Sequence, residues 1–160
     1  MQTRSAVVLL LLLGAAVSLS LAQETPAISP LSGKSASDIT ARFGPRTHPV
    51  LGITKAHDGV DFEVPEGTPV RATAGGMVAF AGANGDYGLQ VRIRHAGGYR
   101  TSYAHLSRLV TRKGARVRQG EVIGYSGRTG LGSSPHLHYE VVRNGIPVDP
   151  SRFMGQPGSN

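Results

Sequence analysis

The chain of 160 residues contains no cysteine, and this absence excludes three kinds of site. Without thiols there is no disulfide framework, no cysteine-rich zinc site and no lipid-carrying N-terminal cysteine. Any bound metal ion must therefore be held by histidine, aspartate or glutamate side chains.

Long apolar runs are confined to the N-terminus. Residues 1–22, MQTRSAVVLLLLLGAAVSLSLA, combine a basic start at Arg4, an apolar run from Ala6 to about Val17, and small residues before and at Ala22. This layout is typical of a secretory signal, and the run is too short to indicate a membrane span. We expect cleavage after Ala22, export to the periplasm or cell wall, and no stable membrane insertion afterwards. A retained N-terminal anchor is the alternative.

Negative charge is scarce, because 10 acidic residues face 17 Lys and Arg residues, a formal charge of +7. Removing Arg4 with the signal leaves +6. A basic exported protein suits an anionic partner such as a cell-wall polymer or a membrane surface, although the charge can equally serve solubility. Nucleic acid is disfavoured as a partner by the export signal and by the lack of a basic helix or an RNA-binding aromatic motif.

Helical periodicity is missing as well, and so are internal repeats and heptads. Glycine, with 22 residues, divides the chain into short alternating apolar stretches. This texture predicts an all-β, mainly antiparallel sandwich or barrel-like fold. We expect residues 23–38 to be a flexible lead, residues 39–152 to form one domain, and residues 153–160 to be a flexible tail.

The strands are separated by glycine turns. The Gly75–Gly76 pair breaks PVRATAGGMVAFAG into two strands or one bent strand, and Gly97–Gly98 suits a hairpin turn after GLQVRIRH. Asn144–Gly145 is a strong tight-turn signal after LHYEVV.

Six histidines are present, and four of them fall into suggestive patterns. In HDGVDF, His57 and Asp61 are four residues apart, a spacing that lets an imidazole and a carboxylate converge on one ion in either a helix or an extended segment. Such a pair is also typical of surface or hydrogen-bonding residues. On a strand, His136 and His138 share one face, so that they suit a metal or a reaction, or a polar solvent face.

The other face of the same strand is apolar. We expect Leu137, Tyr139 and Val141 to point into the core. In GYRTSYAHL, alternation predicts one shared face for Tyr99, Thr101, Tyr103 and His105. Taken alone, a histidine at a strand end is more typical of a structural residue.

Together these segments resemble the lysostaphin-type (LytM-like) zinc metallopeptidases, which cut peptides of bacterial cell walls. The resemblance runs from about Ile39 to Pro150 and rests on ordered segments: RFGPRTHPVLG, HDGVDF, GTPVRA, GYRTSYAHL, GEVIGYSGRTG, SPHLHYEV and PVDP. One departure is Ser133–Ser134 before the histidine pair, where relatives often carry threonine and glycine.

The resemblance implies a site. His57, Asp61 and His138 occupy the positions of the ligands of one Zn²⁺ ion, in a narrow groove. His105 and His136 occupy the positions of the two catalytic histidines. The chain has no HExxH glutamate to act as a base, so we expect one of these histidines to accept the water proton and the other to stabilise the tetrahedral intermediate.

Other polar residues are weaker candidates. Arg46, His48 and Tyr103 could contact the substrate, although structural or surface roles suit each of them. Glu140 shares its strand face with His138 and could orient that ligand, or be a solvated residue. For His95, beside Gly97–Gly98, a turn-capping or exposed role is expected.

The resemblance implies a secreted, monomeric zinc endopeptidase that hydrolyses the peptide cross-links of peptidoglycan stems, and the form of GPRTHPVLG favours a cross-link between D-amino acids. Two alternatives remain: a catalytically silent wall-binding regulator of another hydrolase, and a zinc amidase that cuts a different wall amide. Residues 23–38 could also fold across the groove as a latch.

Overall fold

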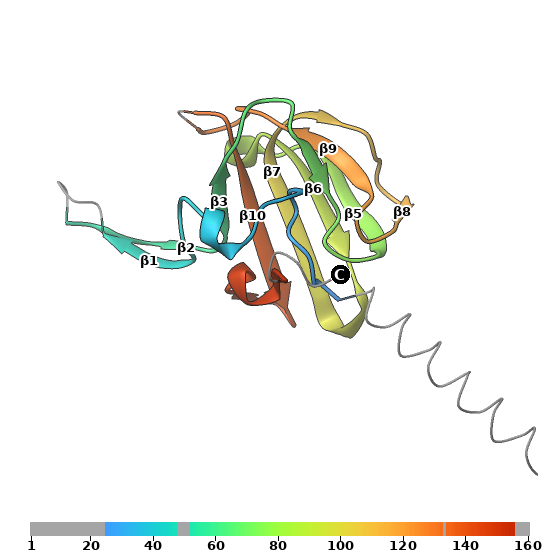
Figure 1. Cartoon of the computed structure of the whole chain (residues 1–160), viewed down its shortest axis with the longest axis horizontal. Coiled ribbons are helices and arrows are strands. Elements are labelled where there is room, and N and C mark those ends of the chain that lie inside the picture. The colour runs from blue at the N-terminus through green and yellow to red at the C-terminus, as the bar shows by residue number, and fades with distance from the viewer. Residues whose placement is uncertain (1–24, 48–51, 133, 156–160) are drawn as a thin grey trace, which may run out of the picture.

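The chain folds into a mainly antiparallel β structure with a few short 3₁₀ turns (Figure 1). The computed structural model describes residues 25–47, 52–132 and 134–155. Within these residues the large sheet does not close into a barrel, but the predicted all-β antiparallel class is confirmed. None of the described helices has the length and apolar character needed to cross a membrane. The predicted signal, residues 1–22, lies outside the described residues.

The described residues form eleven strands and four 3₁₀ turns. The strands are β1 Gly44–Thr47, β2 Thr54–His57, β3 Val60–Glu63, β4 Pro69–Arg71, β5 Gly76–Ala83, β6 Leu89–Arg94, β7 Tyr99–Leu109, β8 Arg116–Val117, β9 Val122–Ser126, β10 His136–Arg143 and β11 Ile146–Val148. The turns are η1 Ala36–Asp38, η2 Gly85–Tyr87, η3 Ala96–Gly98 and η4 Pro150–Phe153.

The described strands form two sheets. β1 and β2 make a two-stranded ribbon that extends to the left of the main body in Figure 1. The main sheet has the order β11-β10-β7-β6-β5-β8, with β3 on the free edge of β10 and β9 joining β4 to β7. Strand β10 is therefore central, because it pairs with β3 and β11 along one edge and with β7 along the other.

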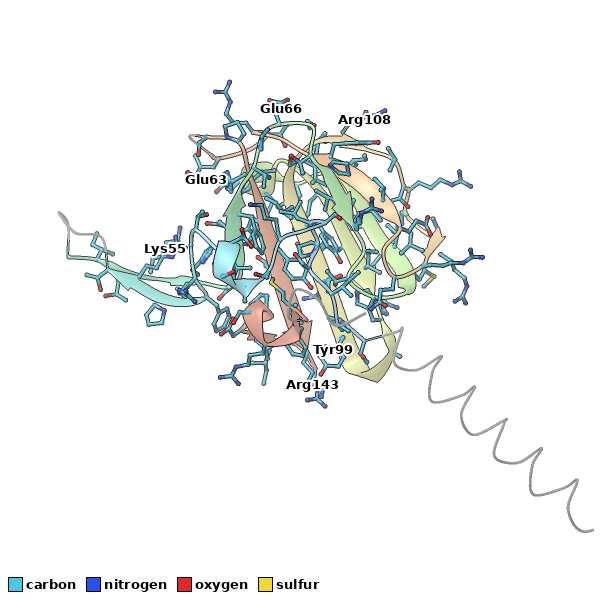
Figure 2. The ribbon with its side chains drawn as sticks, viewed as in Figure 1. Lys55, Glu63, Glu66, Tyr99, Arg108 and Arg143 are labelled. Carbon is cyan, nitrogen blue, oxygen red and sulfur yellow. The ribbon has the colours of Figure 1, made fainter. Side chains whose placement is uncertain are left out.

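The core lies on one face of β10, as alternation predicts. Leu137, Tyr139 and Val141 are each 0 % exposed, and Phe62 of β3 and Ile93 of β6 are buried with them. Charged side chains lie on the outside, as Figure 2 shows for the exposed Lys55, Glu66, Arg108 and Arg143. The opposite face of β10, which carries its two histidines, is thus free to build a site.

The glycine turns are confirmed. Asn144 and Gly145 have φ of 50° and 83° and connect β10 to β11, and Gly97 and Gly98, at 65° and 75°, connect β6 to β7. Positive φ at both central residues matches the right-handed twist of the joined strands. The break at Gly75–Gly76 separates β4 from β5.

Residues 25–38 differ from the flexible lead predicted by composition. The side chain of Leu31 is 1 % exposed within the core, and the Arg71 amide donates to the Pro30 carbonyl at 2.9 Å. Ser35 and Asp38 form a capping box around η1. Burial of one leucine and a few backbone hydrogen bonds order a segment whose Pro/Ser content indicated disorder. Leu31 anchors the middle of this segment on the core side of the sheet and not on the histidine face.

The C-terminal boundary also lies later than predicted. The ring of Phe153 packs edge-on against Tyr99 with centroids 5.6 Å apart, and Met154 is 7 % exposed. The domain therefore continues through at least residue 154, while residues 156–160 of the predicted tail lie outside the described residues.

His95 is a structural histidine rather than an exposed turn residue. It is 7 % exposed; its Nδ1–H donates to the Gly75 carbonyl at 2.7 Å, and its Nε2 lies 2.7 Å from the Thr101 hydroxyl. Burial lowers its pKa, although the hydrogen bond to Gly75 opposes this shift. The neutral ring, with Nε2 accepting from Thr101, is the form that fits.

This burial predicts a pH dependence of stability. The unfolded chain protonates His95 at about pH 6.5, whereas the folded chain does so only at lower pH. The unfolded state therefore binds more protons in this window. The contribution of neutral His95 to the free energy of unfolding is complete above about pH 6.5 and decreases as the pH falls through the folded pKa. Denaturant unfolding at a series of pH values should show a shallower loss in His95→Asn than in the wild type. Equal slopes would contradict this assignment.

Candidate active site

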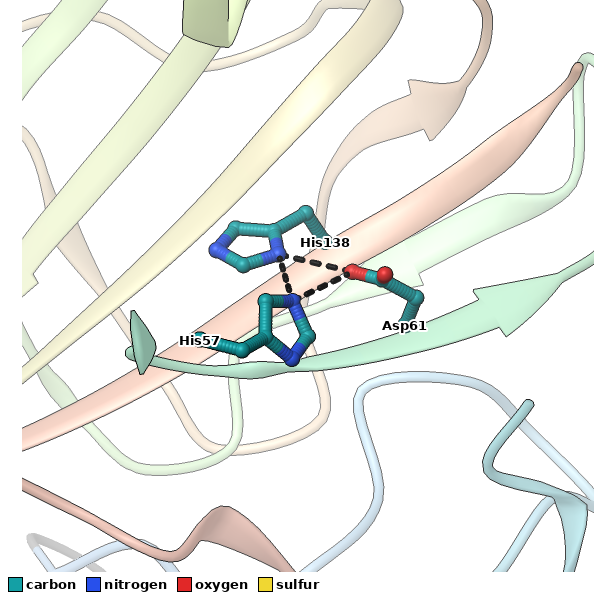
Figure 3. A group of neighbouring side chains, drawn as sticks. All are labelled: His57, Asp61 and His138. Carbon is teal, nitrogen blue, oxygen red and sulfur yellow. Dashed lines mark hydrogen bonds and ion pairs between the residues drawn. The ribbon is translucent and has the colours of Figure 1, made fainter. Parts of the chain in front are cut away.

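Three potential metal ligands meet on the free face of β10 (Figure 3). Nδ1 of His138 lies 2.7 Å from Oδ1 of Asp61, and Nε2 of His57 lies 3.3 Å from each of these two atoms. The side chains are partly or largely buried, with 10 % exposure for His138, 15 % for His57 and 19 % for Asp61. The structure thus brings together the three residues that the motifs singled out.

Strand register explains how residues 77 positions apart come together. His138 and Asp61 are direct partners on the antiparallel strands β10 and β3, so their side chains share one face. His57 ends β2, and a turn through Asp58 and Gly59 leads into β3. The segment is therefore extended rather than helical, and its four-residue spacing brings both side chains to one point.

Two further hydrogen bonds fix the imidazole tautomers. Nδ1–H of His57 donates to the Arg42 carbonyl at 2.8 Å, which leaves Nε2 as an electron-pair donor. Nε2–H of His138 donates to Oε1 of Glu140 at 3.0 Å, which leaves Nδ1 as the nitrogen that can give its electron pair to a metal ion. Such outer hydrogen bonds orient metal-binding histidines and raise their basicity.

Carboxylates set the charge preference of this cluster. Burial alone would lower the pKa of His138, but hydrogen bonds to Asp61 and Glu140 raise it to about 9. Burial alone would raise the pKa of Asp61, but its contacts with the imidazoles of His138 and His57 hold it well below its usual range. Asp61 is therefore ionised, and the two carboxylates favour a positive charge beside them at His138.

The donor set fits a zinc ion. Zn²⁺ binds imidazole nitrogen and carboxylate oxygen at about 2.0–2.2 Å in tetrahedral geometry, which places ligand atoms roughly 3.3 Å apart. Two of the three separations here are 3.3 Å. Three protein ligands leave one tetrahedral position for water or substrate, as in catalytic rather than structural zinc sites.

Gly59 makes the close approach of the β2–β3 turn to β10 possible. A Cβ atom at this position would lie 2.5 Å from the Tyr139 carbonyl oxygen and 2.9 Å from both Cε1 of His138 and Cγ of Glu140. A side chain would therefore push the turn away from β10 and separate the ligands.

Gly59→Ala is expected to lower the free energy of unfolding by about 1–3 kcal/mol, as overpacking of a well-packed site does, and to weaken zinc binding. Denaturant unfolding and calorimetric zinc titration would measure both effects. Gly82→Ala is the matched control, because its Cβ would meet only a ring atom of Phe80 at 3.7 Å. Wild-type zinc affinity in Gly59→Ala would refute this role.

His105 lies on the face opposite to the predicted one. Its φ is 59°, a left-handed conformation that is uncommon for residues other than glycine. Alternation along β7 breaks here, so Tyr103 packs against Tyr139 in the core while His105 turns toward the site. The prediction of one shared face for Tyr103 and His105 is therefore wrong. Strain of this kind is concentrated at functional sites.

The two imidazoles outside the ligand cluster form a pair. The ring centroids of His105 and His136 are 4.5 Å apart, and that of His105 is 6.1 Å from His138. Each Nδ1–H donates to a backbone carbonyl at 2.8 Å, from His105 to Thr129 and from His136 to Ser134. The Nε2 atoms of His105 and His136 take no part in these two hydrogen bonds. Burial lowers the pKa of His105, although its hydrogen bond to the Thr129 carbonyl opposes this shift.

The three candidate substrate contacts have different outcomes. Arg46 on β1 is exposed and places Nη2 3.8 Å from Oδ2 of Asp61, beside the site. Tyr103 is 0 % exposed, and its hydroxyl lies 2.9 Å from the Thr73 amide, which donates to it. Its burial in the core contradicts the predicted substrate contact. His48 and Ser133 lie outside the described residues.

Tyr87 is a site residue that the sequence motifs did not indicate. Its hydroxyl donates to Oε1 of Glu140 at 3.0 Å, and its ring centroid is 5.9 Å from that of His138. Burial, together with the charge of Glu140, raises the pKa of Tyr87 to about 12. The residue lies in η2, far from the histidines in sequence, and the flanking glycines of NGDYG were the available signal.

Comparisons with known proteins agree with this geometry. Residues 55–150 match Peptidase family M23. The DD-carboxypeptidase/endopeptidase Mpg of Neisseria meningitidis serogroup B is 52 % identical over 112 residues, which cover 70 % of this chain and 26 % of that protein. The peptidoglycan DD-endopeptidase ShyC of Vibrio cholerae is 45 % identical over 113 residues, with 70 % and 26 % coverage. The chain thus spans about a quarter of the length of these relatives.

Solved structures show the same fold. A zinc-containing peptidase from Vibrio cholerae superposes with a TM-score of 0.74 at 36 % identity, covering 80 % of this chain and 40 % of that one. The catalytic domain of lysostaphin from Staphylococcus simulans superposes with a TM-score of 0.64 at 32 % identity, covering 74 % and 93 %. These matches confirm the family resemblance predicted from the motifs. The chain belongs to peptidase family M23.

Proposed function

We propose that this protein is an exported zinc-dependent endopeptidase that hydrolyses peptide cross-links of peptidoglycan. The observation that carries the proposal is the convergence of His57, Asp61 and His138 within 3.3 Å, beside the His105–His136 pair. The two relatives, named as a DD-carboxypeptidase/endopeptidase and as a peptidoglycan DD-endopeptidase, support a cross-link between D-amino acids as the bond that is cleaved. We propose that the protein acts as a monomer in the periplasm or cell wall.

In this proposal, His57, Asp61 and His138 hold the zinc ion. Bound zinc supplies Lewis acidity, which polarises the scissile carbonyl and makes water a nucleophile near neutral pH. Glu140 keeps Nε2–H of His138 engaged, so that Nδ1 remains the ligand atom. Arg42 has the same effect on His57 through its carbonyl oxygen.

The free Nε2 atoms of His105 and His136 carry the proton transfers. Because burial lowers its pKa, His105 is neutral near pH 7 and accepts the proton of the attacking water. His136, when it carries a proton on Nε2 as well as on Nδ1, donates a hydrogen bond from Nε2–H to the developing oxyanion and passes that proton to the leaving amine. Positioned acids and bases of this kind contribute about 10²–10⁴-fold to turnover.

Digestion of defined muropeptides tests the function. The purified protein is incubated with a cross-linked tetrapeptide dimer and with an uncross-linked pentapeptide monomer, with and without zinc, and the products are identified by mass spectrometry. We expect conversion of the dimer to monomers, and loss of this activity with a chelator. Release of sugar from peptide would indicate an amidase, and an intact dimer in the presence of zinc would indicate a silent regulator; both results would overturn the proposal.

A further inference from the structure

Three arginines form a row across the main sheet. Arg94 of β6 is directly opposite Met77 of β5 on one side and Arg100 of β7 on the other. Met77 is in turn opposite Arg116 of β8. Direct partners on antiparallel strands project from the same face, so Arg94, Arg100 and Arg116, here called the arginine row, extend from one face of four neighbouring strands.

The arginine row shares its sheet face with the candidate active site. Arg100 is directly opposite Val142 of β10, and Val142 is four residues beyond His138 on the same strand. Residues two or four apart on a strand share a face. At about 3.3 Å per residue, Arg100, the member of the row nearest the site, therefore lies roughly 13 Å from the metal ligand along the strand direction.

Within the described residues, the arginines of the row form no ion pair with a carboxylate. All three arginines are exposed, and among the described residues no carboxylate oxygen lies within 4.0 Å of their guanidinium groups. Glu140 lies on this face but is engaged by His138 and Tyr87. Like charges directly opposite each other, such as Arg94 and Arg100, destabilise a sheet, and a bound anion would remove that cost.

A fourth cation lies between the row and the site. Arg92 is directly opposite Ser102, which is itself opposite Glu140. The Arg92 guanidinium stacks 4.6 Å from the centroid of the Phe80 ring, and its buried Nε has no hydrogen-bond partner among the described residues. Positive charge thus continues from the row toward the metal ligands.

The outer end of the row opens into a cavity of about 870 Å³. Arg94, Arg116 and Arg118 line it, together with Glu121, whose Oε2 accepts from the Arg118 amide at 3.0 Å. In this cavity a carboxylate could approach several guanidinium groups at once, and the guanidinium of arginine is the group best suited to bind a carboxylate.

We propose that the arginine row binds free carboxylates of the peptidoglycan peptide stems while another stem of the same polymer occupies the active site. This inference rests on the proposed function for the identity of the polymer. The shared sheet face favours an extended polymer over a membrane, because the partly exposed side chains between row and site, Arg92 and Glu140, are both charged, whereas Ser102 and Val142 are buried. Met77, directly opposite both Arg94 and Arg116, is the single large apolar side chain among the paired positions that form the row.

Binding to purified sacculi tests the inference without any turnover. The full chain is treated with chelator and pelleted with intact sacculi, and the bound fraction is measured at two salt concentrations. The triple variant Arg94→Gln/Arg100→Gln/Arg116→Gln is compared with Arg112→Gln/Lys113→Gln/Arg152→Gln, which removes the same charge from exposed positions outside the row. Thermal unfolding of both variants verifies folding.

We expect the row variant to bind sacculi about tenfold more weakly, since several exposed ion pairs are lost together, and the control variant to bind like the wild type. Amidation of the sacculus carboxylates should weaken wild-type binding to the level of the row variant. Equal losses in both variants would show that net charge alone acts. Preferential binding of the wild type to vesicles of anionic phospholipid would identify a membrane surface instead. Either result would overturn the inference.

Turnover separates this inference from the proposed function. Cleavage of the soluble cross-linked dimer by the row variant at the wild-type rate, with weakened sacculus binding, supports both. Wild-type sacculus binding by the row variant, with the dimer still cleaved, refutes the arginine row alone. An uncleaved dimer with row-dependent sacculus binding refutes the peptidase activity and leaves the binding surface in place.

Discussion

Asp61→Asn is expected to abolish both zinc binding and turnover. Oδ1 of Asp61 lies within 3.3 Å of both imidazole donors and contributes the only negative charge among the three ligands. The amide has nearly the same shape but no charge, so the affinity should fall by more than the roughly 10–100-fold typical of losing an outer hydrogen-bond partner. Calorimetric zinc titration and turnover of the cross-linked dimer measure the two effects.

Asp58→Asn is the matched control for this variant. Asp58 is an exposed carboxylate three residues before Asp61, in the turn that leads into β3. The Asp58→Asn variant should retain zinc affinity and activity. It should also retain the rise in melting temperature that a tightly bound ion gives to a folded protein. Zinc binding at wild-type strength in Asp61→Asn would remove the metal site as assigned, and with it the proposed chemistry.

Loss of either free imidazole is expected to lower turnover by about 10²–10⁴-fold while zinc stays bound. His136→Ala removes one ring from β10. For the other ring His105→Asn is preferable to alanine, because asparagine tolerates the positive φ of 59° at this position. The loss of turnover in His105→Asn can then be attributed to the missing proton acceptor and not to added backbone strain.

Zinc titration and a pH profile of kcat/KM identify these roles. Both variants should bind zinc as tightly as the wild type, because neither ring belongs to the ligand cluster. Burial lowers the pKa of His105, so the wild type should keep its activity to a lower pH than an ordinary imidazole would allow, and His105→Asn should lose this acid limb. Near-native turnover in either variant would refute its assignment.

Local sequence determined much of the architecture. Alternation in LHYEVV predicts which side of β10 faces the core, and Leu137, Tyr139 and Val141 are buried accordingly. Glycine pairs and Asn144–Gly145 predict the turns, because few other residues adopt positive φ. Composition was a poorer guide to the domain ends, since the burial of Leu31 and Met154 depends on contacts with distant strands.

The candidate ligands could also be predicted from the sequence, because the spacing of histidine and aspartate within a short segment limits which side chains share a face. What the sequence left open is which distant segments become neighbours. The register of β3 against β10 brings Asp61 to His138, and the left-handed backbone at His105 turns its ring from the core to the site.

The remaining features depend entirely on cross-strand pairing. The hydrogen bond from Tyr87 to Glu140, the narrow space at Gly59 and the arginine row join residues from different strands or turns, each unremarkable within its own segment. The sequence by itself determined the residue types, the alternation and the turns, because these depend on near neighbours along the chain. Only the tertiary structure decided which charges and rings meet, because hydrogen-bonded strand register, and not distance along the chain, sets those contacts.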